Sequence, residues 1–268
     1  LSDDAAAAVR RHYASVPPAL QPGVLRVGQL LARRRALVER WRVEVSALGG
    51  RLRLPNRLIP EADYAQDLEL KVPRAQLREW DSIHEELSRG GVYQAFCWLR
   101  DQYVEAVERH EIQHRLDYAR GLRPLPSVLA RHLGQEGNLD LPEGSLAARS
   151  RDETSAYLAS IATANAPLLD LVLLGRHLFD RDSLGGPYSY AALVVLETIA
   201  RQLGEDPNTY FGERGVRRDD AARLFAKVIG RSSQEIQAAA QRGYLEQFGY
   251  PAAALTLRTL RQYPSWRH

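Results

Sequence analysis

One segment, Val92 to Arg120, constrains the fold most, because it reads as a single long helix that must pack one face inward. Gly90 and Gly91 precede it, and Gly121 ends it. Apolar and then ionisable side chains recur along it at steps of three or four, so they share one face. These residues are Phe96, Leu99, Tyr103, Ala106, His110, His114 and Asp117. The face that should point toward the core therefore carries two histidines.

Other segments predict a mainly α protein with a small β element. Residues 24–48 carry apolar side chains at helical spacing and are followed by Gly49 and Gly50, a glycine stop typical of a helix C-terminus. The segments "RLRLP" and "DLELKV", within residues 51–73, alternate apolar and polar side chains and predict two short strands. Further helices are expected at 150–164, 167–180, 189–204, 218–229, 232–248 and 252–262.

Composition narrows the classes of function. The single cysteine, Cys97, excludes an internal disulfide and a cysteine-based zinc site. The 36 basic residues are spread among 33 acidic ones, for a formal charge of +3, so a nucleic-acid partner is not expected. The longest apolar run, "APLLDLVLLG", is interrupted by Asp170, which argues against a transmembrane segment. The chain begins at Leu1 and contains no methionine, so we expect that an upstream segment, such as a signal peptide or lipid anchor, has been removed or is not included in this sequence, and we favour an exported protein over a cytoplasmic one.

Residues 109–114, "RHEIQH", place His110 and His114 one helical turn apart on the inward face. This spacing suits two ligands of one tetrahedral zinc ion, and Glu111 lies close enough to act on a water molecule there. Burying two imidazoles without partners is costly, and a metal satisfies both. A second interpretation stays open, in which Glu111 forms an ion pair with Arg115 and the histidines are hydrogen-bonded core residues.

A catalytic zinc ion needs a third protein ligand. The extended form of the motif is excluded, because Asp117 and Arg120 stand where it requires Gly and His. Later in the chain, "RSRDETSAYLASIA" carries Glu153 on the second predicted helix, with Ala156 one turn further on. In these two stretches the chain resembles the gluzincins, HExxH zinc metallopeptidases in which a later Glu-x-x-Ala helix completes the site. Small residues one turn after the glutamate let two helices approach closely.

The resemblance implies a zincin-like core over residues 91–180, with a helical and strand-bearing lobe at 1–90 and a helical lobe at 181–268, or one compact domain that combines them. It also implies that Glu153 is the third zinc ligand and that Glu111 is the general base and acid in hydrolysis of a peptide or protein substrate. Endopeptidase activity is favoured over exopeptidase activity. Candidates for the donor that stabilises the oxyanion are Tyr157, His177, Tyr188 and Tyr190.

The chain also departs from the gluzincin pattern. Tyr157 stands where many members carry an Asp that orients a histidine ligand. Asp117, on the histidine face, is a candidate for that role by accepting a hydrogen bond from an imidazole, or it caps a loop amide. Ser150 and Glu153 also fit a capping box, in which the carboxylate needs no metal. Asp152 is the alternative ligand if the helix register differs by one residue.

Two other functions remain open. A catalytically silent relative would bind zinc or peptides without hydrolysing them, and replacing Glu111 would not change what it does. A metal-free helical interaction module would use Arg-rich faces, such as that of "LARRRALVERWR", to bind partners. Such a module would tolerate the loss of both His110 and His114.

Overall fold

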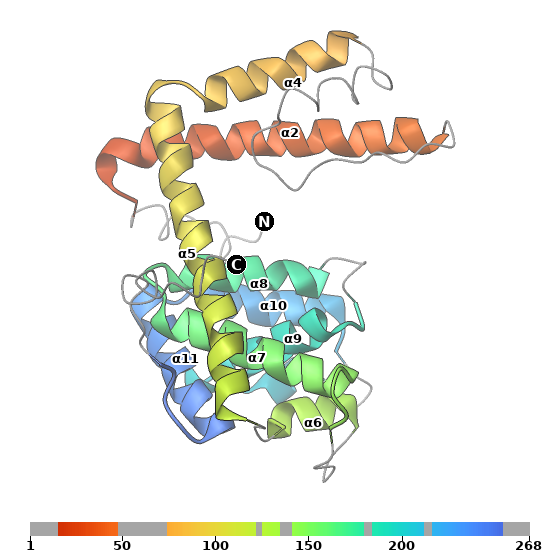
Figure 1. The fold of residues 1–268 in the computed structure, drawn as a ribbon, viewed down its shortest axis with the longest axis vertical. Coiled ribbons are helices and arrows are strands. Elements are labelled where there is room, and N and C mark those ends of the chain that lie inside the picture. Colours follow the sequence, from red (N-terminus) through yellow and green to blue (C-terminus); the bar gives the residue numbers. More distant parts are fainter. Residues whose placement is uncertain are drawn as a thin grey trace. The chain divides into compact units, whose positions relative to one another are not determined.

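The fold is described from a computed structural model that places residues 16–47, 74–121, 125–134, 141–179, 184–211 and 216–253 (Figure 1). Contacts divide the chain into two compact units, with the division between Asp101 and Gln102. We refer to Val16–Asp101 as the first unit and to the part from Gln102 onward as the second unit. Among the described helices, none is both long enough and apolar enough to cross a membrane.

The first unit contains the short helix η1 (Pro18–Leu20), helix α2 (Gln21–Ala47), helix α4 (Arg74–Leu87) and the beginning of α5 (Gly90–Arg120). Its core forms around Trp41 and Trp80, whose ring centroids lie 5.2 Å apart. Helices α2 and α5 approach closely at Gly23, where a Cβ atom would come within 2.6 Å of the Gly91 carbonyl oxygen. Glycine at position 23 is therefore required by this contact.

The second unit is built around helix α7 (Leu146–Thr163), which packs against four other helices. Those are α6 (Ser127–Leu133), α8 (Pro167–Phe179), α9 (Pro187–Gln202) and α11 (Ser233–Phe248). Helix α10 (Arg218–Ile229) covers α8 and α9, and the short helix η3 (Pro207–Thr209) follows α9. Helix α7, which lies among these helices in Figure 1, has buried residues on most of its faces, and many of their side chains are small.

A buried ion-pair network lies between α6 and α9. Glu197 on α9 is only 2% exposed and accepts hydrogen bonds from His132 Nε2 at 2.8 Å, from Arg201 at 3.1 Å and from Arg131. Burial by itself would raise the pKa of Glu197, but the hydrogen bonds from His132 and Arg131 outweigh burial and hold the pKa below its ordinary value. The carboxylate therefore stays ionised inside the protein.

Within the described residues the structure confirms a mainly α protein and contains no strand. The predicted start of a helix at Ser150 is wrong, because Ser145 caps α7 by accepting a hydrogen bond from the Ala148 amide at 3.2 Å. The Ser150–Glu153 capping box is therefore wrong as well, since both residues lie inside the helix. The two predicted strands and most of the helix expected at 252–262 lie outside the described residues.

We expect Glu197→Ala to lower the free energy of unfolding by about 1.5–3 kcal/mol, because it removes a buried carboxylate that accepts hydrogen bonds from His132 and from two half-exposed arginines. The matched control is Glu246→Ala, since Glu246 pairs with the same Arg201 at 3.4 Å but is 43% exposed. That control should cost less than about 1 kcal/mol. Urea unfolding followed by circular dichroism measures both, and equal effects would contradict the importance of the buried network.

Candidate metal centre

His110 and His114 project from consecutive turns of α5 and their rings meet. The ring centroids are 4.6 Å apart at an interplanar angle of 85°, and the two Nε2 atoms are 3.0 Å apart. The His110 side chain is 13% exposed and the His114 side chain is 27% exposed. The structure therefore places the pair on the inward face of α5, as the helical spacing predicts.

Glu153 on α7 reaches the same point from the other side. Its Oε2 atom lies 3.2 Å from His110 Nε2 and 3.8 Å from His114 Nε2. Two small residues bring the helices together here, because Ser160 on α7 donates a hydrogen bond to the Ala106 carbonyl of α5 at 3.4 Å. His110, His114 and Glu153 each offer one ligand atom, and these atoms lie within 4.8 Å of one another.

The spacing of these three atoms fits a zinc ion. Ligand atoms at the usual Zn–N and Zn–O distances in a tetrahedral site lie about 3.4 Å apart, and the three distances here are 3.0, 3.2 and 3.8 Å. Glu153 Oε2 is buried and forms no hydrogen bond to any described residue, in spite of its approach to His110. A cation between the three side chains would supply the partner that this oxygen lacks.

Electrostatics around the histidines also suit a metal ligand. Burial lowers the pKa of His114, and the neighbouring His110 lowers it further, whereas Glu153 acts in the opposite direction. The result is a preference for the neutral imidazole at ordinary pH. The neutral ring is the form that binds metal ions.

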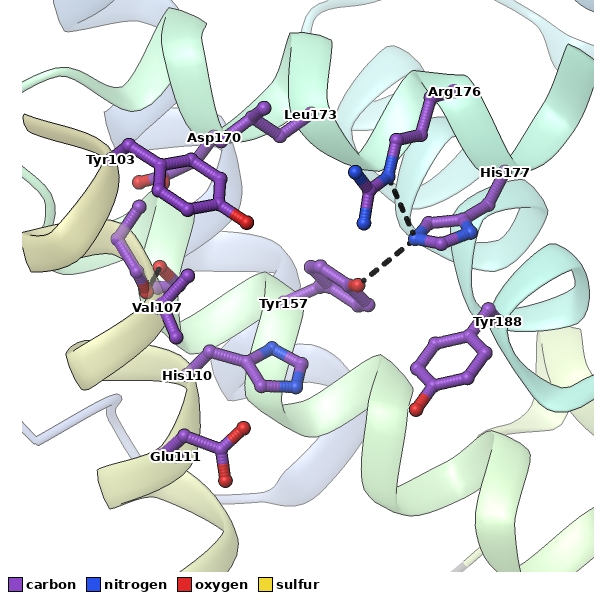
Figure 2. A pocket seen from close by; sticks show the side chains of 12 residues that line it. Tyr103, Val107, His110, Glu111, Tyr157, Asp170, Leu173, Arg176, His177 and Tyr188 are labelled. Carbon is purple, nitrogen blue, oxygen red and sulfur yellow. Dashed lines mark hydrogen bonds between the residues drawn. The ribbon is translucent and has the colours of Figure 1, made fainter. Parts of the chain in front are cut away.

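A pocket of about 360 Å³ is lined by one of the three candidate ligands, His110, whereas His114 and Glu153 are not part of its lining (Figure 2). Helices α5, α7, α8 and α9 supply its walls. Its polar lining residues include His110, Glu111, Tyr157, Arg176, His177 and Tyr188. Glu111 thus lines the same pocket as the candidate ligand His110.

Tyr157, His177 and Tyr188 form one wall of this pocket (Figure 2). The Tyr157 ring lies 4.4 Å from the His110 ring, and its hydroxyl lies 3.3 Å from His177 Nε2. His177 in turn stacks on Tyr188 with centroids 5.1 Å apart. Burial raises the pKa of Tyr157, and the negative charge of Glu153 raises the pKa of Tyr188. Both phenols therefore keep their protons and remain hydrogen-bond donors at neutral pH.

Three other predicted residues lie elsewhere. Tyr190 does not line the pocket, because it packs against the small apolar cluster of Val128, Leu129 and Val194. Asp117 is buried and accepts a hydrogen bond from Gln113. Asp152 is 43% exposed and pairs with Arg151 at 2.8 Å. Tyr190 is therefore removed from the candidates for the oxyanion donor.

The structure also adds pocket residues that the sequence did not single out, among them Ser160, Asp170 and Arg176. The available signal for Asp170 in the sequence was that its charge interrupts an apolar run. Nothing in the local pattern of Ser160 or Arg176 distinguishes them, since only the packing of α7 and α8 brings them to the pocket.

Comparison with known protein families, curated proteins and solved structures yields no match for this chain. The site is therefore interpreted from its own geometry and chemistry.

We expect the purified wild-type protein to contain about one zinc ion per chain, and Glu153→Ala to lower zinc affinity by at least about 100-fold, since even outer partners of a ligand cost 10- to 100-fold. Asp152→Ala is the matched control, because this neighbouring carboxylate is half exposed and paired with Arg151. Mass spectrometry on untagged protein measures the content. Equal zinc in both variants, or none in the wild type after zinc is added, would contradict the three-ligand site.

Proposed function

We propose that this protein is a zinc metallopeptidase of the gluzincin type that hydrolyses internal peptide bonds. The observation that carries the proposal is the convergence of His110, His114 and Glu153, together with a pocket that both His110 and Glu111 line. A structural zinc site is closed by four protein ligands, whereas a catalytic site keeps one position open. Three candidate ligands, one of which lines a pocket, are closer to the catalytic type than to a site closed by four ligands.

Zinc held there would polarise a substrate carbonyl and make a water molecule more acidic. Glu111 lines the pocket next to His110, so it is placed to accept the proton from the attacking water. The same carboxyl group then donates that proton to the amine that leaves when the peptide bond breaks. Glu111 thus acts first as a base and then as an acid, and it ends each cycle ionised.

The tetrahedral oxyanion needs a donor on the opposite side of the pocket. Tyr188 is the best placed of the predicted candidates, because its hydroxyl points into the space in front of His110 (Figure 2). The effect of the Glu153 charge on the pKa of Tyr188 also indicates that this phenol lies near the metal centre. Tyr157 has a positioning role instead, since its hydroxyl is engaged with His177.

We expect Glu111→Gln to keep its zinc and lose hydrolysis of a casein or mixed-peptide substrate by about 10²- to 10⁴-fold, because the amide cannot accept the proton. The control is Glu108→Gln, the same chemical change one turn earlier on α5 and outside the pocket lining. Product analysis by mass spectrometry follows the reaction.

The outcomes of that measurement separate the possible functions. Zinc without hydrolysis in the wild type would identify a catalytically silent zinc-binding protein. Unchanged hydrolysis in Glu111→Gln would exclude Glu111 as the base. Neither zinc nor hydrolysis would leave a metal-free helical interaction module.

We expect Tyr188→Phe to lower kcat by about 10²- to 10³-fold with little change in KM, because the lost hydroxyl acts on the oxyanion. Tyr190→Phe is a matched control, since this tyrosine lies two residues away on the same helix but packs toward α6. Steady-state kinetics of both variants measure kcat and KM and test whether Tyr188 stabilises the oxyanion. A loss in Tyr190→Phe equal to that in Tyr188→Phe would argue against the assignment.

A further inference from the structure

The end of the pocket away from Tyr188 has a different chemistry from the metal centre. Its walls are formed by Tyr103, Ala106 and Val107 of α5 and by Leu173 of α8. Among these mainly apolar side chains lies the carboxyl group of Asp170, beside Tyr103 (Figure 2). This end of the pocket therefore combines an apolar lining with a single acid.

Asp170 is buried without a full set of partners. The residue is 5% exposed, and its Oδ2 atom has no hydrogen-bond partner among the described residues. Burial raises the pKa of Asp170 to about 7, although Arg109 and Ser160 act to lower it. A buried carboxyl group with an oxygen that has no hydrogen-bond partner is costly to keep, so a ligand that reaches it with a positive charge would stabilise it.

The nearest cation is already engaged elsewhere. Arg109 donates a hydrogen bond to Glu105 at 3.0 Å, and Asn165 donates to the same carboxylate oxygen at 2.7 Å. Arg109 and Glu105 therefore largely balance each other, and Asp170 adds a further acid. Arg176, which lines the pocket, is exposed and donates a hydrogen bond to His177 Nε2 at 3.5 Å.

We propose that Asp170 is the specificity-determining residue of this pocket and that it binds a lysine or arginine side chain of the substrate. The apolar walls match the aliphatic stem of such a side chain, and the carboxylate matches its charged end. This inference rests on the proposed peptidase function, because it names the class of substrate for the same site. It is tested by binding as well as by hydrolysis.

The kinetic test uses peptides that differ at one residue, arginine in one and citrulline in the other, because citrulline has nearly the same shape and no charge. Sites of cleavage are first mapped with a mixed peptide library. We expect wild-type kcat/KM to favour arginine over citrulline by about 10- to 100-fold, and Asp170→Asn to remove most of that preference. The matched control is Asp219→Asn, which removes an exposed carboxylate from α10.

The binding test uses zinc-loaded Glu111→Gln protein and the tripeptides Gly-Arg-Gly and Gly-citrulline-Gly in isothermal titration calorimetry. Tighter binding of the arginine peptide, lost on adding Asp170→Asn but not Asp219→Asn, supports the inference even if the wild type cleaves nothing. Cleavage without discrimination between arginine and citrulline overturns this inference and leaves the peptidase proposal standing. Absence of both cleavage and discrimination overturns both. Circular dichroism of each variant establishes that it is folded.

Discussion

The local contact of α5 with α7, through Ala106 and Ser160, is the interaction on which the candidate site depends. Ala106 on α5 and Ser160 on α7 are small enough for a side chain of one helix to reach the backbone of the other, at 3.4 Å. Ala156, which is fully buried, lies one turn after Glu153 and keeps the same approach possible. With larger residues at these positions the helices would separate, and Glu153 would lose contact with the histidines.

The N-terminus of α7 is capped by Ser145 and its middle is stabilised by packing, so Glu153 serves neither purpose. The absence of a hydrogen-bond partner for the buried Glu153 Oε2 among the described residues is therefore informative. The network around Glu197 shows the contrast within the same unit, since that buried carboxylate has three donors from the protein itself. Glu153 and Asp170 each have a buried carboxylate oxygen without a hydrogen-bond partner among the described residues, and Asp170 lines the pocket.

Much of the helical content was predictable, because helical spacing and glycine or proline boundaries are local signals. Helix α10 begins and ends where the spacing predicts, and the inward direction of His110 and His114 follows from the stripe that precedes them. The start of α7 was mispredicted, because the sequence at Ser150 has the form of a capping box although the cap is at Ser145. The sequence could not show that Tyr188 lines the pocket and Tyr190 does not, because this difference depends on which helices pack against each face of α9.

The three candidate ligands rise from the interiors of two helices, and none comes from a loop. All three lie in the second unit, on helices that are already formed, so a metal ion would meet a preorganised chelate and would not have to order the chain around itself. In this respect the centre differs from small zinc domains that are unfolded without their ion. Metal uptake and folding would then be separable events, and the identity of the ion would be governed by a fixed cavity.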